Sequence, residues 1–394
     1  MSQITQMKHF NKIFYAAMLL LSAAFLFFGN RIASGNMFVS DFEMMPTYTA
    51  RVVEIAEIND MTEDFGIDWG FITTSIIVTF YAEISSGEMT GQIVRAEQVA
   101  TSEREKLVHV GDRVLLMYND FNHEFWFIEY VRTNTIIILA VVFFIMLVIF
   151  AGIKGFNSII SLGFICMAIF LVFIPAILSG MNIYLTAAII SLYAIVSTLL
   201  IIIGPNKKAV SAILGCLGGI LFAGVMMYSM DVLLHLTGLI DHETSNLLNI
   251  PTPVPIDIRA VIFAGVIIGC TGAIMDVAMS ISSSLWEVNK ASAAPSFKSI
   301  FKSGLEIGKD ILGTMLNTLI LAYIGSSISL IILISASNVS LVELLNTELI
   351  IVEFLRALVG GFGMFLTMPL TSAICGWLFM KKNPNQSDFE QEEI

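Results

Sequence analysis

One apolar segment of the chain carries a stripe of small and polar residues that could handle a proton or a cation. Its members follow at steps of three and four, which places them on a single helical face: Gly265, Gly269, Gly272, Asp276, Ser280 and Ser283. Gly265 and Gly269 form a GxxxG pair, which lets a second helix approach closely. Asp276 is the chemically active member, because an apolar environment favours its protonated form and a cation or an opening to water would release the proton.

Further polar residues occur at comparable places in the last two apolar segments. Asp310, Thr314 and Asn317 share one helical face at steps of four and three, and Thr371 follows the helix-breaking Pro369 by two residues. At a rise of about 1.5 Å per residue, Asp276 and Asn317 each lie roughly 12 Å from the cytosolic end of their helix, and Thr371 is expected at a similar depth.

Two interpretations of Asp276 remain open. As an ion or proton site it would be the coupling residue of a transport process, with Asn317, Ser280, Thr314, Asp310 and Thr371 as polar neighbours. As a structural residue it would donate or accept a helix-packing hydrogen bond with Asn317 or a serine hydroxyl. A water-accessible path to Asp276 would favour transport, and a sealed contact would favour packing.

Two further patterns concern helix packing and metal binding. Gly215 and Gly219 repeat the glycine spacing in the preceding apolar segment, which predicts that the two segments pack together. Asp231 and His235 form an i, i+4 pair that could contribute to a metal site, although a simple hydrogen bond between them is the favoured interpretation. We therefore predict no metal and no other cofactor.

The elements that carry these residues must be membrane helices. The chain has 394 residues, of which 56% are hydrophobic and only 13% charged, whereas soluble proteins have roughly 25% charged residues. A soluble enzyme with one buried core is excluded. Apolar runs long enough to cross a bilayer predict eight spans: 13–29, 135–153, 158–179, 183–203, 209–236, 260–284, 311–334 and 355–380.

Charge indicates the orientation of these spans. Segment 41–130 holds 17 acidic and five basic residues, so it carries the whole net charge of −12. With the N-terminus in the cytosol, eleven of the twelve lysines lie on the cytosolic side, as the positive-inside rule requires. We therefore expect both termini inside and segment 41–131 outside. The first span, 1–30, is expected to be an anchor, with a cleaved signal peptide as the alternative.

The exported segment has the pattern of a small all-β domain without cysteines. Five β-type runs predict a barrel or sandwich over 41–131: Thr49–Ile58, Thr73–Ile84, Gln92–Val99, Arg113–Tyr118 and Glu124–Val131. An acidic loop at Asn59–Gly70 could bind calcium but lacks the EF-hand glycine, so a solvated loop is favoured. The seven remaining spans form a helical domain over 132–382, followed by an acidic cytosolic tail at 383–394.

Several shorter helical signals flank the spans. Phe297–Lys309 combines an apolar stripe with three lysines, which predicts an amphipathic helix on the cytosolic leaflet, capped by Ser296. Ser340 and Glu343 form a capping box, and Glu353 with Arg356 forms an i, i+3 ion pair. Phosphate-loop, dinucleotide, zinc-protease and serine-hydrolase motifs do not occur, so we do not expect an enzyme.

The helical part resembles the YibE/F family of bacterial multi-pass membrane proteins from about Val131 to Met380. The motifs that carry the resemblance are Lys154-Gly155-Phe156, His235-Leu236-Thr237-Gly238-Leu239, Asp257 with Arg259, the run from Gly272 to Ser280, the run from Gly308 to Met315, Asn317-Thr318-Leu319 and Pro369-Leu370-Thr371. The exported β domain is similar to that of the longer, YibE-like members. The resemblance implies a bacterial plasma membrane location and a shorter YibF-like membrane sibling as a partner, with a homo-oligomer as the alternative; it implies no particular activity.

The sequence thus predicts a mainly α protein, a polytopic bundle with one small all-β domain inserted outside the cytosol. Two function classes remain open. One is a transporter or permease of unknown substrate coupled through Asp276. The other is a non-transporting scaffold or envelope-sensing protein whose β domain binds a partner. In both cases the protein contacts the lipid bilayer and no nucleic acid.

Overall fold

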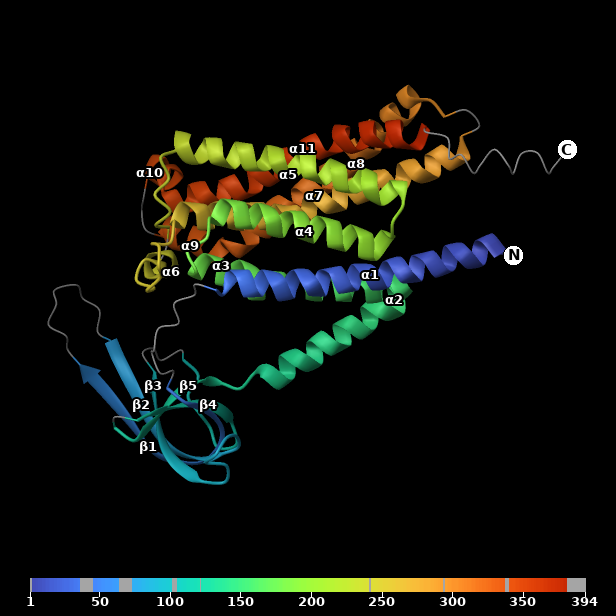
Figure 1. The fold of residues 1–394 in the computed structure, drawn as a ribbon. Coiled ribbons are helices and arrows are strands. Elements are labelled where there is room, and N and C mark those ends of the chain that lie inside the picture. The colour runs from blue at the N-terminus through green and yellow to red at the C-terminus, as the bar shows by residue number, and fades with distance from the viewer. Residues whose placement is uncertain are drawn as a thin grey trace. The chain divides into compact units, whose positions relative to one another are not determined.

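The chain folds into two compact units, which are described separately (Figure 1). The computed structural model describes residues 2–35, 45–63, 73–100, 105–120, 122–240, 242–292, 295–336 and 340–380. One unit spans 40–147 and contains all the strands, and the other comprises 1–39 and 148–394 and contains most of the helices. The predicted acidic tail at 383–394 lies outside the described residues.

The strand-containing unit is built around a closed five-strand barrel. Its strands are β1 Thr47–Glu63, β2 Thr73–Ile84, β3 Ile93–Ala100, β4 Arg113–Asn119 and β5 Glu124–Tyr130. They follow the order β1-β2-β3-β5-β4, with β4 closing on β1; β3 and β5 pair in parallel and the other neighbours are antiparallel. Alternate residues such as Val78, Phe80 and Leu116 fill the interior. The predicted small β domain is confirmed.

The acidic segment after Ile58 is partly strand. Asn59 to Glu63 continue β1 and pair in register with β2, ending with Glu63 opposite Thr73. Two register shifts earlier in β1 are β-bulges, which bend a long strand around a small barrel. The predicted loop at Asn59–Gly70 is therefore wrong in its first half, and residues 64–72 lie outside the described part of the chain.

Seven helices among the described residues are long and apolar enough to cross a membrane. The predicted spans 135–153 and 158–179 fall in one 46-residue segment, in which α2 (Thr133–Ala168) runs through a π-helical turn (Ile169–Phe173) into α3 (Ile174–Leu178), and the predicted boundary between the spans lies at a kink in α2. At about 1.5 Å per residue its 46 residues extend for about 69 Å, more than two bilayer crossings need. Gly152, at φ 59° and ψ −136°, interrupts the helical backbone inside α2.

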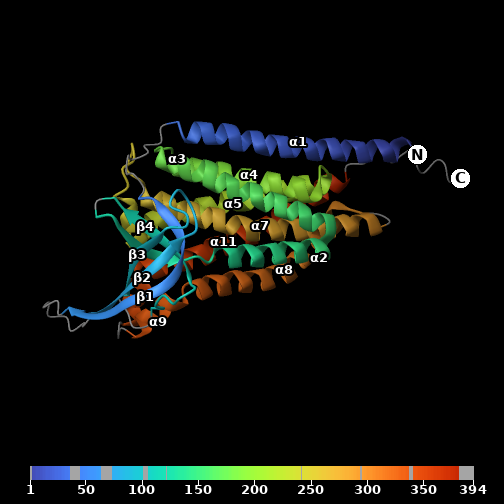
Figure 2. The same cartoon turned by 90° about the horizontal axis from the view of Figure 1, so that it is seen from below.

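Five long helices run side by side in the helical unit (Figures 1 and 2): α4 (Ile183–Ile203), α5 (Lys207–Leu233), α7 (Ile258–Ala291), α8 (Phe297–Ser326) and α11 (Glu348–Met380). Their main core includes Ile267, Ile274 and Ile281 of α7. A second core joins α4 to α1 (Ser2–Ala33), where Phe25 stacks on Tyr193 at 4.2 Å between ring centroids. Short helices α6 (His242–Leu247), α9 (Ile328–Ala336) and α10 (Leu341–Asn346) complete the unit.

The predicted surface helix at Phe297–Lys309 is instead the first part of α8. Ser296 caps it as expected, accepting the Ser299 N–H at 3.1 Å, but its apolar stripe packs on the bundle. Ile300 is buried in the main core and the Phe297 ring lies against Gly376 of α11. The predicted span 311–334 is also corrected, because α8 ends at Ser326 and α9 begins at Ile328. The expected cap at Ser340 is present, with the Glu343 N–H at 3.2 Å, as is the ion pair of Glu353 with Arg356 at 2.7 Å.

Candidate functional site

Asp276 lies on an outward side of α7 that the described residues leave uncovered. The residue is exposed, and its carboxylate makes no hydrogen bond with any described residue. The glycines of its stripe border open space: a Cβ added to Gly265 or Gly272 would meet no atom within 4 Å. At Gly269 the nearest atom to such a Cβ would be the Tyr323 hydroxyl oxygen of α8, at 3.5 Å. The stripe therefore has room beside it and lies next to α8.

The neighbouring helix α8 also turns its polar residues away from the core. Asp310, Gly313, Thr314 and Asn317 are all exposed, and a Cβ at Gly313 would meet nothing within 4 Å. The Thr314 hydroxyl donates to the Ile311 carbonyl of its own helix at 3.0 Å. The Asn317 amide has no hydrogen-bond partner among the described residues. On α8, as on α7, the polar groups are presented to whatever surrounds the chain.

Contacts between α7 and α8 show which of these residues lie at the same height. Going along the two antiparallel helices, Leu285 meets Gly304, Ile281 meets Gly308, and Gly269 meets Tyr323. Asp276 therefore lies level with about Gly313 and Thr314, and Asn317 lies about one helical turn farther along, near the level of Gly272. We call this surface the α7–α8 face: Gly265, Gly269, Gly272 and Asp276 of α7, with Asp310, Gly313, Thr314 and Asn317 of α8. Ser280 is half-buried at its edge and has no hydrogen-bond partner among the described residues.

Thr371 belongs to a different, closed contact. A Cβ at Gly215 would overlap the Thr371 hydroxyl oxygen, and one at Gly219 would overlap that of Thr367. We call these four residues the α5–α11 seam. α5 and α7 do pack together, but through other groups, including Ser211 and Ser282, whose hydroxyl oxygens are 3.2 Å apart. The glycine pair of α5 thus faces α11 and not the glycine stripe of α7.

The depth expected for Thr371 is wrong. Its neighbour Ser372 meets Gly304 at the level of Leu285, which is nine residues from Asp276 along α7, or about 13 Å. Thr371 is fully buried, and its hydroxyl oxygen has no hydrogen-bond partner among the described residues. Pro369 does not break α11, which continues to Met380. Thr371 is therefore a packing residue of the seam and does not belong to the α7–α8 face.

The predicted Asp231–His235 pair does not form. α5 ends at Leu233, and His235 takes a left-handed backbone with φ 52°, so it leaves the helical face of Asp231. One Asp231 carboxylate oxygen is buried and has no hydrogen-bond partner in the described part of the chain. Within the described ranges no three His, Cys, Asp or Glu side chains lie close enough to hold a metal ion.

A carboxylate clamp at the same end of the bundle was not predicted. Glu348, at the start of α11, accepts the N–H groups of Thr237 and Gly238 at 2.8 and 2.6 Å and the Thr237 hydroxyl at 2.7 Å. The local sequence signal for such a tight turn is the glycine at position 238. Its backbone has a positive φ, which favours glycine. The clamp ties the start of α11 to the loop that follows α5.

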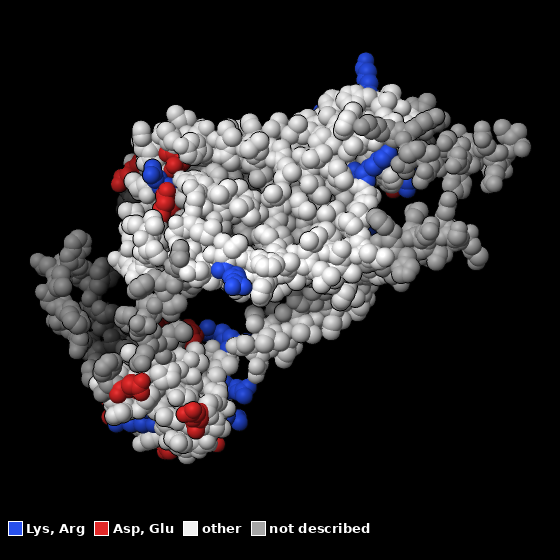
Figure 3. Space-filling view, viewed as in Figure 1, with Lys and Arg blue, Asp and Glu red and all other residues white. Residues whose placement is uncertain are grey.

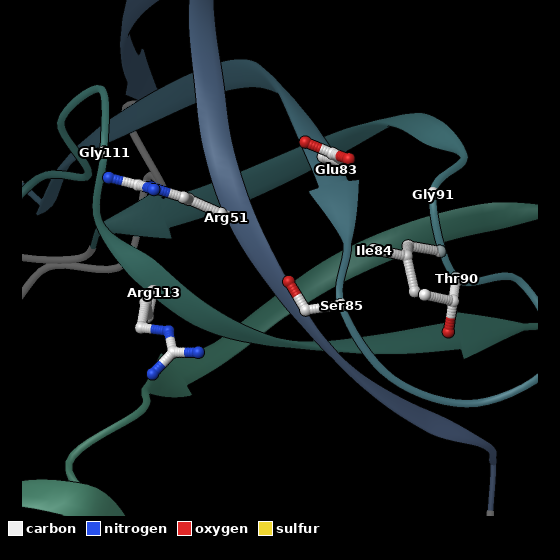
Figure 4. A pocket seen from close by; sticks show the side chains of 8 residues that line it. All are labelled: Arg51, Glu83, Ile84, Ser85, Thr90, Gly91, Gly111 and Arg113. Carbon is white, nitrogen blue, oxygen red and sulfur yellow. The ribbon is translucent and has the colours of Figure 1, made fainter.

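The barrel has a pocket of its own, which the sequence did not indicate (Figure 4). It encloses about 510 Å³ and is lined by Arg51, Glu83, Ser85, Thr90 and Arg113, among others. Arg51 of β1 lies directly opposite Arg113 of β4 in the sheet register. Like charges directly opposite one another destabilise a sheet, and neither guanidinium forms an ion pair with a described residue. Glu83 of β2 lies opposite Arg51 on its other side, so the pocket combines two guanidiniums with one carboxylate.

Fold and site together define a multi-pass membrane protein with a polar helical face and a small β-barrel domain. The YibE/F-like protein family matches residues 139–381, more than half of the chain. The chain therefore belongs to the YibE/F-like family, and the expected resemblance is confirmed. Comparisons with curated proteins and with solved structures found no match.

Proposed function

We propose that this protein is a proton- or cation-coupled permease of the plasma membrane and that Asp276 on the α7–α8 face is its coupling residue. The observation that supports the proposal is the uncovered Asp276 carboxylate. It lies in the middle of a membrane-spanning helix, has no hydrogen-bond partner among the described residues and is bordered by open space. A carboxylate used only for packing within the chain would be expected to contact a neighbouring helix.

The chemistry of the face fits reversible proton or cation binding. An ionised carboxylate in the hydrocarbon region costs about 2.5–3.5 kcal/mol on insertion scales, so the neutral or cation-bound form is favoured there. Contact with water on either side of the membrane would shift the group toward the free anion. The Asn317 amide oxygen and the Thr314 hydroxyl are oxygen ligands of the kind that hard cations accept. Such a site binds in one environment and releases in another, which is what coupling requires.

The distribution of charge supports the proposed orientation. Figure 3 shows acidic side chains gathered at the end of the helical unit that carries α6 and α10, and basic side chains mainly at the opposite end. Lys207 and Lys208 begin α5 at that opposite end. We propose that the basic end faces the cytosol, since cytosolic loops are enriched in lysine and arginine. The barrel-containing segment would then be extracytoplasmic.

The proposal is tested by flux in proteoliposomes. Purified full-length protein is reconstituted, gradients of H⁺, Na⁺, K⁺ or Mg²⁺ are imposed, and internal pH and cation dyes are read. Wild type should dissipate at least one gradient faster than empty liposomes do, and Asp276→Asn should lower that rate about 100-fold, since it removes the titratable group and preserves size. Glu306→Gln is the matched control, because Glu306 is an exposed carboxylate of α8 that pairs with Lys309 at 3.0 Å. Wild-type flux equal to empty liposomes, or equal fluxes in wild type and Asp276→Asn, would refute the coupling role.

A second candidate is a non-enzymatic envelope-binding protein, and the arginine pocket of the barrel is the observation that favours it. Two guanidiniums that form no ion pair with a described residue, together with the hydroxyls of Ser85 and Thr90, could bind phosphate or carboxylate groups of an envelope polymer beside Glu83. With polyphosphate as the probe, the nanodisc-embedded protein should bind at least tenfold more weakly after Arg51→Gln combined with Arg113→Gln. Arg95→Gln is the control, because Arg95 already pairs with Glu97 at 3.1 Å. Equal affinities in all three proteins would exclude the pocket.

A further inference from the structure

We infer that the α7–α8 face is the contact surface of a two-fold symmetric dimer, in which Asp276 of each copy faces Asn317 of the other copy. The inference concerns assembly and does not depend on transport. Its starting point is that lipid cannot be the final neighbour of this face. Hydrocarbon offers no hydrogen bond to an amide or a carboxyl group, and residues of this kind in membrane helices almost always face protein or a water-filled cavity.

The shape of the face suits another helix. Gly265, Gly272 and Gly313 all border open space, so a helix backbone can approach both α7 and α8. Close approach at small residues is the usual way in which membrane helices associate, because dispersion contacts replace the hydrophobic driving force that is absent in lipid. The buried seam of the same bundle shows this mode of packing, with Gly219 against Thr367.

The chemistry of the face identifies a second copy as the occupant. Asp276 supplies hydrogen-bond acceptors on α7 and the Asn317 amide supplies donors on α8, and their heights along the bundle differ by about one turn, or about 5 Å, which the two side chains together can span. A two-fold axis along the membrane normal keeps heights unchanged and exchanges the two helices. The contact between Asp276 of one copy and Asn317 of the other then occurs twice, which is the pattern of an isologous interface. The first half of α2 cannot supply these partners, because residues 136–151 contain no polar side chain.

The test measures dimerisation of the full-length chain in lipid. Single-molecule photobleaching of labelled protein, diluted in lipid bilayers, gives the dimer fraction as a function of protein density. Gly272→Leu fills the open side of α7 without touching its own chain and should weaken dimerisation at least tenfold. Gly163→Leu is the matched control, since a Cβ at this glycine of α2 also meets nothing within 4 Å but lies off the face; it should leave the dimer fraction unchanged.

A mixing experiment separates pairing between copies from pairing within one copy. Asp276→Leu and Asn317→Leu should each dimerise poorly alone, because each removes both cross-contacts. Mixed one to one with different labels, they should form heterodimers at least about sixfold in excess of either homodimer, whereas random pairing gives a twofold excess. One Asp276–Asn317 contact is regained in that pair.

Three results would overturn the inference. A wild-type chain that stays monomeric at every density shows that a second copy does not cover the face. A dimer insensitive to Gly272→Leu places the contact elsewhere. A heterodimer yield of only twice either homodimer, the ratio that random pairing gives, shows that the two side chains do not pair across copies. A chain that stays monomeric and captures a different membrane protein would likewise show that a second copy does not cover the face. A dimer that forms as expected while Asp276→Asn leaves every flux unchanged would support this inference and refute the coupling role.

Discussion

The α5–α11 seam and the α7–α8 face start from the same sequence pattern and end in opposite situations. Both have glycines four residues apart with polar side chains nearby. In the seam, the threonines of α11 fill the space beside Gly215 and Gly219, and all four residues are buried. On the face, Gly265 and Gly272 border open space and the Asp276 carboxylate has no hydrogen-bond partner among the described residues.

The difference shows what a small-residue pattern does and does not specify. It specifies that a helix can come close, because a missing side chain leaves space on one side of the backbone. It does not specify whether that helix belongs to the same chain. The polar residue beside the glycines is more informative: Thr367 can satisfy its hydroxyl within its own helix, whereas Asp276 cannot satisfy a carboxylate in that way.

The largest expected difference is in the loss of stability when a glycine is replaced by leucine in the seam or on the face. Gly215→Leu collides with Thr371 and should lower stability by about 3 kcal/mol, as expected for overpacking of a tight contact. Gly272→Leu should leave the melting temperature of the detergent-solubilised monomer unchanged. Thermal unfolding is followed by the reaction of a fluorogenic maleimide with the buried Cys216, Cys270 and Cys375, after Cys166→Ser removes the exposed thiol. Equal losses at both glycines would mean that the two surfaces are alike.

The second contrast lies inside the seam and is smaller. Thr367 donates its hydroxyl to the Gly363 carbonyl at 2.8 Å, so Thr367→Val should cost about 1 kcal/mol. The Thr371 hydroxyl is buried without a partner among the described residues, so Thr371→Val should be neutral or stabilise by about 1 kcal/mol. The same thiol assay reports both. If Thr371→Val destabilised as much as Thr367→Val, Thr371 would have a partner outside the described residues.

Much of the fold was predictable because it follows from local patterns. The five strands alternate inward and outward side chains, so each of the five predicted strand regions overlaps an observed strand. Ser296 and Ser340 were recognisable as caps because the N-terminal N–H groups of a helix need a nearby acceptor. The family resemblance rests on several short motifs in 131–380 and agrees with the matched range 139–381.

The features that were predicted wrongly share a physical cause: each depends on neighbours that are distant in sequence. The apolar stripe at 297–305 has the pattern of a membrane-surface helix, but Gly304 and Gly308 let α8 pack against Ser372 and Met368. The height of Thr371 relative to Asp276 depends on how far α11 slides along α7, which no single helix encodes.

The Glu348 clamp has a mechanical consequence for the bundle. Its three hydrogen bonds join α11 to the loop leaving α5, while the seam holds the same two helices together along their length. α5 and α11 are thereby fastened at two separate places and should move as one rigid body. Any rocking motion of the bundle would then have its sliding boundary elsewhere than between α5 and α11.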